Sequence, residues 1–402
     1  MHIAMFADQH LESLGGAQVS MRLQKRFLEL AGHTVTVVAP AMHGTREAAS
    51  DPAYLDMPSM PITLDREYSL TWPGARTDQW VDAAFSALPP VDVVHVQADF
   101  WGAFIGHRFA RRHALPVVHT MHNRVDVGIE HTAPFPSLVL RALNAWQGRV
   151  LGSSPDRVPG GRDGWSFLAR FAARSDAVTA PSSHFARRLE AHGAVPASGS
   201  VDVIWNGIDD AVLDEVLAEP AVGALGEARR PKFVWLGRMS PEKRLLPFLE
   251  ALAQSGVVAD VGVIGGGGQL RAARRLIEKR QPVASVTFAG RLPYVETLRR
   301  IAAADAVVQT SIGFETQGMT IFEAASLGTP SIVSDPDLAG ELGSGLWPVA
   351  DDSVAALADS LLRAAADITA GEAPAVDPGV REAFRQSSRT AAMVEVYQRV
   401  TA

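Results

Sequence analysis

The strongest constraint on the fold is a repeated alternation of short Val- and Ile-rich runs with longer amphipathic stretches. This alternation is typical of a parallel sheet covered by helices. In the first half, the predicted strands are residues 3–6, 35–39, 91–96, 117–120, 177–180 and 201–204. In the second half, they are residues 233–236, 261–264, 286–288, 306–310 and 331–333. The pattern therefore predicts an α/β protein with two doubly wound, Rossmann-like domains.

The boundary between the two domains is predicted at Asn206-Gly207, because this pair has the chemistry of a turn. The expected domains are residues 1–205 and 206–383, and a loop rich in Pro, Gly and Ala at 219–231 precedes the first strand of the second sheet. Residues 353–366 and 380–400 are predicted helices. We expect the last segment, about residues 384–402, to pack back on the first domain.

The composition excludes several classes of function. With 37 basic and 44 acidic side chains the net charge is -7, so no global field favours nucleic acid. Cysteine is absent, which excludes disulfides, thiolate nucleophiles and cysteine-zinc sites. No apolar run of about 18 residues occurs. The chain also enters its first strand directly, without the pattern of a signal peptide. We therefore expect a cytoplasmic protein, and the inner face of the membrane is the alternative location.

Two glutamates, Glu315 and Glu323, flank a predicted transition from strand to helix. Glu315 is expected in the loop after the strand at 306–310, and the helix is expected to begin near Gln317 or Gly318. Ligands of parallel sheets bind at this edge, where the first N–H groups of a helix are free to bind phosphate. Helical rise would separate the two carboxylates by roughly 10 Å, about the span of a nucleotide sugar. Alone, the motif is better explained by Glu315 as a helix cap and Glu323 as a surface residue, and only the other motifs of the chain reverse this interpretation.

Other loops that follow predicted strands carry further candidates. Gly15-Gly16 opens a helix after the first strand, where the backbone could approach a phosphate closely. Arg238 and Lys243 follow the first strand of the second domain, and together they could complement a diphosphate. The alternative for this loop is an exposed basic segment that pairs with Glu242. The glycine run 265–268 lacks the spacing of a dinucleotide fingerprint and indicates a close turn between strand and helix.

Histidines cluster in the first domain and raise the hypothesis of a metal site. They are His95, His107, His113, His119, His122 and His131. His119 and His122 lie at the end of a predicted strand, where side chains three positions apart point to opposite faces. We therefore expect no metal, and we expect one histidine to project into a cleft from the strand at 117–120.

Taken together, these motifs resemble those of the retaining GT-B glycosyltransferases of family 4. The resemblance rests on Gly15-Gly16, the His122 loop, Asn206-Gly207-Ile208-Asp209, Gly237-Arg238 with Lys243, Gly290-Arg291-Leu292, Glu315 with Glu323, and Gly328-Thr329-Pro330, in that order. It covers nearly the whole chain. It implies a hexosyltransferase with a nucleotide-sugar donor held mostly by the second domain, and no metal or other cofactor.

The resemblance also implies a role for each candidate residue. Glu323 would accept both ribose hydroxyls, and Arg238 and Lys243 would hold the diphosphate with help from the N–H of Gly16. The transferred sugar would be held by Glu315 and the amides of Gln317 and Gly318. His122 would lie near the reacting centre, and Gln18, His122 and Asn123 are the candidates for acceptor binding. The implied catalytic residues are His122, Glu315, Arg238 and Lys243.

The donor and the reaction class leave alternatives open. Thr316-Gln317-Gly318 resembles the variant of diacylglycerol glucosyltransferases, which favours UDP-glucose and a glycerolipid acceptor, with a small glycoside as the alternative acceptor. No acidic side chain that could accept from guanine occurs in residues 291–295, which also favours uracil. The alternatives are a mannosyltransferase that uses GDP-mannose and a non-catalytic nucleotide-sugar-binding protein. A glycoside hydrolase would also use two carboxylates, but it would not need the phosphate clamp.

Residues 141–174 contain six arginines against two aspartates. Interleaved with them are Trp146, Trp165, Phe167, Leu168 and Phe171. An amphipathic basic face of this kind predicts peripheral contact with an anionic membrane. The alternative is an ordinary packed helix with a solvated face, followed by a loop at 152–164.

Overall fold

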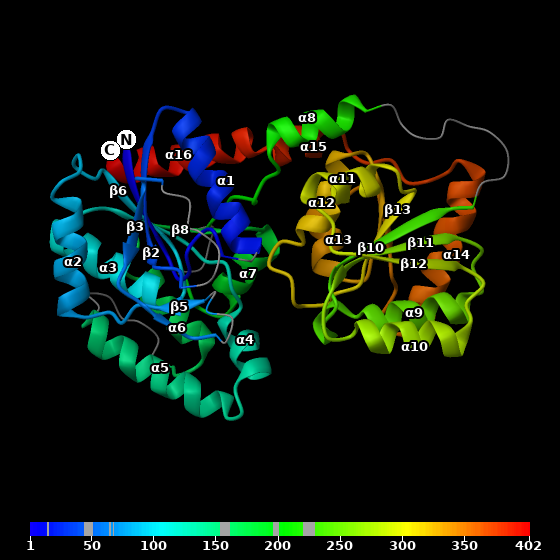
Figure 1. The fold of residues 1–402 in the computed structure, drawn as a ribbon, viewed down its shortest axis with the longest axis horizontal. Helices are drawn as coiled ribbons and strands as arrows, with labels where there is room; N and C mark the ends of the chain where they lie inside the picture. The colour runs from blue at the N-terminus through cyan, green and yellow to red at the C-terminus, as the bar shows by residue number, and fades with distance from the viewer. Residues whose placement is uncertain are drawn as a thin grey trace. The chain divides into compact units, whose positions relative to one another are not determined.

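The computed structural model describes residues 1–13, 16–43, 51–63, 66, 68–152, 161–195, 201–219 and 230–402, with the side chains of all of these except 130–132. Gly15 of the predicted phosphate loop, residues 153–160 of the predicted loop at 152–164 and residues 220–229 of the predicted interdomain loop lie outside these ranges. The chain forms two compact units, one of residues Met1–Gly207 with Gln386–Ala402 and the other of Ile208–Arg385 (Figure 1).

The first unit contains a seven-stranded sheet of order β3-β2-β1-β6-β7-β8-β9, in which every pairing is parallel. Its strands are β1 (His2–Ala7), β2 (Thr34–Pro40), β3 (Tyr54–Met57), β6 (Val93–Gln97), β7 (Val117–Thr120), β8 (Ala177–Ala180) and β9 (Val201–Val203). A separate hairpin pairs β4 (Met60–Pro61) with β5 (Ser69–Leu70). Its helices are α1 (Gly16–Leu30), α2 (Ala75–Phe85), α3 (Trp101–His113), α4 (Val125–Thr132), α5 (Pro136–Leu151), α6 (Gly164–Ala172), α7 (Ser183–Ala191) and α16 (Gln386–Thr401).

Alternation along β1 divides the core of this unit between the two faces of the sheet. Ala4 and Phe6 pack with side chains from α2, α3, α5 and α6. Ile3 and Met5 point to the other face, where α1 and α16 supply the cover. Because the sheet is buried on both faces, most residues of its strands are apolar, and this is why the sequence pattern predicted it.

The second unit repeats the plan with a six-stranded parallel sheet of order β12-β11-β10-β13-β14-β15. Its strands are β10 (Lys232–Arg238), β11 (Asp260–Gly266), β12 (Ser285–Gly290), β13 (Ala306–Gln309), β14 (Ser331–Val333) and β15 (Leu346–Pro348). Its helices are α8 (Asp210–Ala218), the 3-10 turn η1 (Pro241–Lys243), α9 (Leu245–Ser255), α10 (Leu270–Arg280), α11 (Tyr294–Ala302), α12 (Met319–Ser326), α13 (Pro336–Leu342), α14 (Val354–Ala370) and α15 (Gly379–Phe384). Its core lies between one face of the sheet and helices α9 and α14. The predicted doubly wound α/β fold is therefore confirmed.

The chain crosses between the units at Gly207-Ile208 and again at Arg385-Gln386, two residues beyond each predicted boundary. The prediction of one continuous helix over 380–400 was wrong, because the backbone of Arg385 is extended (ψ 140°) and separates α15 from α16. Arg385 forms an isolated parallel bridge with Ile208, whose N–H donates to the carbonyl of Phe384 at 2.9 Å. The helix breaks where the two crossings of the chain lie side by side.

The segment at 141–174 also differs from its prediction. It forms most of α5 and all of α6, and α6 lies in the core: Phe167 and Phe171 are fully buried and Trp165 is 8% exposed. Trp146 is partly buried and packs against Phe104. The apolar residues that were predicted to contact a membrane therefore belong to the core. None of the helices in the described ranges combines the length and apolar composition needed to cross a bilayer.

Candidate functional site

In the second unit, the predicted site residues lie at the carboxyl edge of the sheet. Arg238 ends β10, Lys243 ends η1, and Glu315 lies in the loop between β13 and α12. Because all strands of this sheet are parallel, these loops lie at one edge. The sheet thus gathers residues that are more than seventy positions apart in the sequence.

The glycine run after β11 supports the loop that carries Arg238. Side chains at Gly265 and Gly267 would place a Cβ 2.0 Å from the carbonyl oxygen of Gly237 and 2.7 Å from that of Met239. Both glycines also adopt positive φ angles, +124° and +153°. The N–H of Met239 donates to the carbonyl of Gly266 at 2.9 Å, which fastens the two loops together. The run is a close backbone contact, as predicted, and it positions the arginine loop.

Lys243 and Glu315, predicted to hold a phosphate and a sugar, form an ion pair with each other. Both are largely buried, with side chains 23% and 17% exposed. Ser311 Oγ donates to Glu315 Oε1 at 2.7 Å, and the ammonium of Lys243 lies 5.6 Å from the ring centroid of Phe314. The structure therefore brings a cation and a carboxylate together where a ligand with both phosphate and hydroxyl groups could separate them.

The backbone of Lys243 is also fixed. Thr310 Oγ1 donates to its carbonyl at 2.6 Å, and Trp235 Nε1 donates to Thr310 Oγ1 at 2.9 Å. The indole of Trp235 is 1% exposed, so this bond reaches η1 from the core. The position of the ammonium therefore depends on a rigid support.

Arg238 is more loosely held than Lys243. Its side chain is 66% exposed, and its Nη2 donates to Glu242 Oε1 at 3.0 Å. Burial opposes ionisation of Glu242, but the hydrogen bond from Ser240 and the pair with Arg238 outweigh it and lower the pKa of this carboxyl. The pairing with Glu242 that the sequence offered as the alternative is thus present, although an exposed pair of this kind is weak and exchangeable.

Glu323 lies on α12, is 7% exposed, and accepts a hydrogen bond of 2.8 Å from the hydroxyl of Tyr294. Burial raises the pKa of Glu323, and the bond from Tyr294 opposes this rise. The tyrosine is the first residue of α11 and remains 41% exposed. Sequence reasoning did not find it, although only Pro293 separates it from the Gly290-Arg291-Leu292 motif.

The helix of this site begins one residue later than its latest predicted start. Gly318 is the N-cap of α12, with φ +79°, and a Cβ there would lie 2.8 Å from Leu338 Cδ1. Gln317 beside it is buried. Only the part of the Glu315–Glu323 segment from Met319 onward is helical, so helical rise applies to that part alone. The separation of roughly 10 Å between the two carboxylates stays a prediction.

In the first unit, His122 and Asn123 follow β7, and α1 begins at Gly16 and includes Gln18. Gly16 is exposed and Gln18 is half-buried. His122 Nε2 lies 3.0 Å from Gln97 Oε1, and burial lowers the pKa of His122 to about 4. His122 is therefore a neutral imidazole that donates from Nε2 and leaves Nδ1 as an acceptor.

A buried chain of hydrogen bonds fixes Gln97. Its Nε2 donates to Oε1 of Gln24 and to the sulfur of Met5 at 3.6 Å, and lies 3.5 Å from Nδ1 of His95, so its Oε1 faces His122. The hydroxyl of Tyr397, on α16, lies 2.7 Å from the same His95 nitrogen. Through these bonds the C-terminal helix is connected to His122. Sequence reasoning missed both Gln97 and Tyr397.

Two carboxyl groups, Asp8 and Asp99, lie at the same edge of this sheet. Asp8 accepts from the N–H groups of Asp99 and Gly102, both at 2.8 Å, and burial raises its pKa to about 6. Asp99 is fully buried; burial and the neighbouring Asp8 raise its pKa to about 7, and its Oδ2 accepts from Asn123 Nδ2 at 2.6 Å. Asn123, a predicted acceptor-binding residue, is therefore positioned by Asp99.

The predicted histidine cluster divides between structural roles. His107 and His119 hydrogen-bond to each other at 3.1 Å in the core, and His113 pairs with Asp82 on the surface. His131 is among the residues whose side chains lie outside the description. Across the described residues, no three histidine, aspartate or glutamate side chains gather in a group that could hold a metal ion.

Comparison with known proteins follows the division into two units. The model of Glycosyltransferase Family 4 matches residues 14–212, and the model of Glycosyl transferases group 1 matches residues 224–367. The chain is 25% identical over 343 residues to alpha-monoglucosyldiacylglycerol synthase of Streptococcus pneumoniae, which covers 83% of this chain and 70% of that protein.

A second relative is the GDP-mannose-dependent alpha-(1-6)-phosphatidylinositol monomannoside mannosyltransferase of Mycobacterium tuberculosis. It is 29% identical over 237 residues, which are 53% of this chain and 59% of that protein. Among solved structures, Anabaena HepE in complex with UDP has a TM-score of 0.66 at 16% identity, covering 99% of this chain and all of that one. Sucrose-phosphate synthase of Thermosynechococcus elongatus has a TM-score of 0.66 at 17% identity, covering 99% and 98%. At these identities the likeness shows a shared fold.

Proposed function

Because the chain belongs to the GT-B glycosyltransferases of family 4, group 1, we propose that it moves a hexose from a nucleotide sugar to an acceptor hydroxyl with retention of configuration. UDP-glucose is the favoured donor and a membrane glycerolipid the favoured acceptor. The observation that carries the proposal is the Lys243–Glu315 pair at the carboxyl edge of the second sheet. A nucleotide sugar offers a diphosphate for the cation and sugar hydroxyls for the carboxylate.

Donor binding exchanges partners within this pair. Lys243 turns from Glu315 to the diphosphate, and Arg238 leaves Glu242 to add a second positive charge. Glu315 then accepts hydroxyl groups of the sugar, next to the amides of Gln317 and Gly318. Each charged group exchanges one partner for another. Lys243 and Glu315 are already largely buried in the free protein, so donor binding adds little further desolvation cost for them.

These charges act mainly on the transition state. Negative charge grows on the diphosphate as the glycosidic bond breaks, and fixed cations stabilise it more than they stabilise the bound donor. Lys243 is held by η1 and the Trp235–Thr310 bond, so little reorganisation is needed when the charge develops. The proposed chemistry uses side chains and requires no metal or other cofactor.

Glu323 is proposed to bind the ribose. Its buried carboxylate can accept two vicinal hydroxyl groups in exchange for the bond from Tyr294, its donor among the described residues. The N–H of Gly16 is proposed to help with the diphosphate.

His122 is proposed to act as a neutral acceptor near the reacting centre. Its Nε2–H is used by Gln97, so Nδ1 is the atom available to a sugar or acceptor hydroxyl. A neutral imidazole suits this task, because an imidazolium would repel the positive charge that develops on the sugar ring. Asn123, held by Asp99, and Gln18 are proposed to orient the acceptor.

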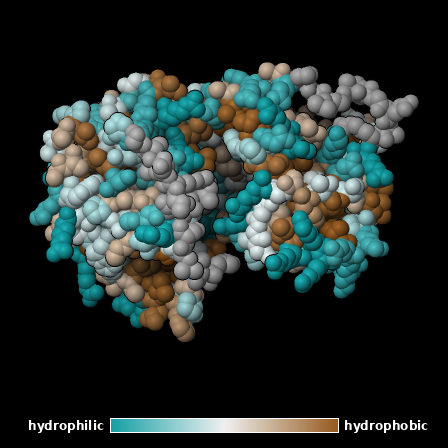
Figure 2. Space-filling view, viewed as in Figure 1, coloured by the Kyte–Doolittle hydropathy of each residue, from teal (hydrophilic) through white to brown (hydrophobic). Residues whose placement is uncertain are grey.

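A lipid acceptor is supported by the names of the two relatives, one a synthase of a glucosylated diacylglycerol and the other a mannosyltransferase of a phosphatidylinositol monomannoside. It is also supported by a surface at the start of α5, where Phe135 and Leu138 are 68% and 65% exposed. Figure 2 shows hydrophobic residues gathered over α5. Arg141 and Arg149 are exposed on the same helix, and this combination suits an anionic membrane. The proposed membrane face thus differs from the one expected from the sequence, which used side chains of α6.

The donor is tested by a thermal-shift and calorimetric screen of UDP-glucose against GDP-, ADP- and TDP-sugars. Stabilisation by UDP-glucose alone supports the proposal. A preference for GDP-mannose would favour the second candidate, a mannosyltransferase, which the relative from Mycobacterium tuberculosis makes the main competitor. Binding without transfer to any lipid or glycoside would contradict the proposed acceptor class.

A further inference from the structure

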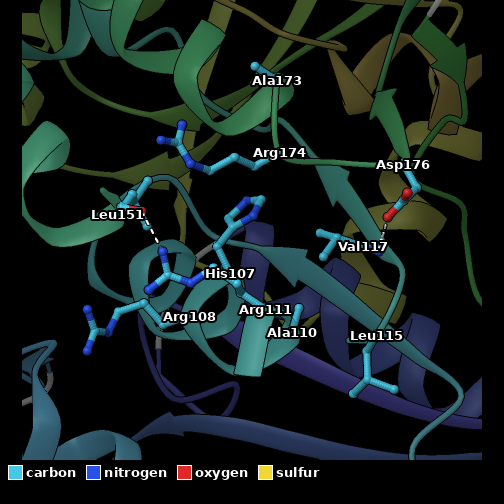
Figure 3. Close-up of a pocket in the computed structure, with 10 residues that line it drawn as sticks. All are labelled: His107, Arg108, Ala110, Arg111, Leu115, Val117, Leu151, Ala173, Arg174 and Asp176. Atoms are coloured by element: carbon cyan, nitrogen blue, oxygen red, sulfur yellow. Dashed lines mark hydrogen bonds between the residues drawn. The ribbon is translucent and has the colours of Figure 1, made fainter. Parts of the chain in front are cut away.

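A cavity of about 260 Å³ opens in the first unit between α3, the last turn of α5 and the segment from Ala173 to Asp176 (Figure 3). Val117, the first residue of β7, is part of its lining, whereas His122 follows the last residue of that strand. The cavity therefore lies at the amino edge of the sheet, opposite the edge that carries the proposed acceptor residues. The proposed transfer reaction does not use it.

Three arginines in this cavity donate to three successive carbonyl groups at the end of α5. Arg108 Nη1 bonds to Val150 at 2.9 Å, Arg111 Nη1 to Leu151 at 3.0 Å, and Arg174 Nη2 to Gly152 at 2.7 Å. Cations commonly stabilise a helix C-terminus, whose partial charge is about half an elementary charge. Three full positive charges exceed what is needed to compensate the partial negative charge at the C-terminus of α5.

Carboxylates of the described residues balance only part of this positive charge. Arg108 pairs with Asp78, but neither Arg111 nor Arg174 makes an ion pair within the described ranges. The carboxylate of Asp176 lines the cavity and accepts the N–H of Val117 at 2.8 Å. Burial, together with the charges of Arg111 and Arg170, lowers the pKa of Arg174. The cavity thus holds positive charges that repel one another.

Donors of both arginines are left over. Among the described residues, Arg111 makes a hydrogen bond only through Nη1, and Nε of Arg174 has no acceptor. Figure 3 shows the two guanidinium groups and the ring of His107 around the same cavity. His107 donates from Nε2 to His119, and burial lowers the pKa of His107 well below its usual value, so it adds no charge at this position.

We propose that this cavity is a binding site for a phosphate-type oxyanion, held between the guanidinium groups of Arg111 and Arg174. Planar guanidinium donors fit the geometry of phosphate oxygens, and a doubly charged anion would relieve the repulsion between the two side chains. The anion is either a soluble phosphate or the phosphate of a lipid headgroup.

The test compares Arg111→Gln with Arg187→Gln. Both remove one positive charge from exposed side chains of the first unit, but Arg187, on α7, lies outside the cavity and outside the proposed membrane face on α5. Binding of inorganic phosphate is measured by calorimetry at constant ionic strength. Binding to phosphatidylcholine vesicles is measured by co-sedimentation, with and without phosphatidic acid. We expect Arg111→Gln to weaken binding of one probe about tenfold, from the loss of a charge-assisted bond, and Arg187→Gln to leave it within twofold.

The probe that responds identifies the source of the phosphate, and either response supports the site. Wild-type protein that binds neither probe saturably, or equal binding by wild type and Arg111→Gln, overturns the proposal. Arg174→Lys serves as the second variant, because it keeps the charge at the end of α5 while removing the planar fork. It is expected to retain the melting temperature and to bind the same probe more weakly.

Discussion

Replacement of Tyr294 by phenylalanine tests the proposed ribose site directly. In the free protein the Tyr294 hydroxyl donates to the buried carboxylate of Glu323 at 2.8 Å. If the ribose hydroxyls bind the same carboxylate, they compete with this bond. The variant keeps the ring and removes the competitor, so UDP binding should become tighter while the free protein becomes less stable.

The expected size of both changes follows from one hydrogen bond to a charged group. Such a bond contributes about 1.5–3 kcal/mol to the free energy of unfolding. The loss in the variant should be smaller, because the buried Glu323 carboxyl can take up a proton when its donor is removed. We expect the free variant to lose about 1–2 kcal/mol of unfolding free energy and to gain about 1–2 kcal/mol in UDP binding, or roughly five- to thirtyfold in Kd. Calorimetry with UDP and thermal unfolding without it measure the two effects.

The pH dependence gives a second, independent readout. Burial already raises the pKa of Glu323, and the bond from Tyr294 opposes that rise, so the variant should have a still higher pKa. A carboxyl whose folded pKa is raised becomes protonated as the pH falls through that value, and its protonated form accepts ribose hydroxyls poorly. UDP affinity should therefore begin to fall at a higher pH in Tyr294→Phe than in wild type.

Tyr54→Phe is the matched control, because it removes a tyrosine hydroxyl that donates to Glu12 at 3.4 Å in the first unit. It should leave UDP affinity unchanged. Weaker UDP binding by Tyr294→Phe would refute the reasoning and would mean that the hydroxyl contacts the nucleotide itself. Equal affinity would mean that the ribose does not use Glu323.

The remaining predictions concern the carboxylates, His122 and metal dependence. Glu323→Ala should weaken UDP binding by about 1.5–3 kcal/mol, roughly ten- to a hundredfold in Kd, whereas Glu315→Ala should mainly lower kcat; unchanged UDP affinity in the first variant contradicts the ribose assignment. Gln97→Glu should raise the pKa of His122 from about 4, because it places a carboxylate next to the imidazole. As the pH is lowered, turnover should therefore begin to fall at a higher pH in the variant than in wild type, and coincident pH profiles would argue against a neutral His122. Turnover should persist in excess chelator, and activity that is lost and then restored by Mg²⁺ would show that the side-chain clamp is insufficient.

The sequence predicted the architecture well because most strands of both sheets are largely buried. Most residues of strands such as β1 and β13 are apolar, and these strands lie between amphipathic helices, so their positions follow from pattern alone. The edge strands β3 and β15 were missed, since Tyr-Leu-Asp-Met and Leu-Trp-Pro are short and carry polar or proline residues. Local pattern cannot distinguish such edges from loops.

The site was predictable in its location but not in its pairings. Ligands bind at the carboxyl ends of parallel strands, and this rule alone predicts that Arg238, Lys243 and Glu315 lie at one edge of the sheet. That Lys243 pairs with Glu315, and Tyr294 with Glu323, depends on loop conformations that only the folded chain defines. The same rule would have identified Asp8, which directly follows β1, and Asp99, which lies two residues after the end of β6.

Burial of α6 shows the limit of reasoning from composition. A basic segment with interleaved aromatic residues fits a membrane surface and a domain core equally well, because arginines can extend to the solvent while their aromatic neighbours pack inward. Phe167 and Phe171 pack against Phe104 in the core, whereas the exposed apolar residues Phe135 and Leu138 lie at the start of the preceding helix.

The return of α16 to the first unit has a consequence for synthesis on the ribosome. Met393, Val396 and Tyr397 complete the face of the sheet that begins with Ile3 and Met5, yet they are made after the whole of the second unit. While residues 208–385 are being translated, that face lacks part of its apolar cover and Tyr397 has not yet reached His95. The second unit is continuous in sequence and can fold as soon as it emerges, so the domain that begins first is completed last.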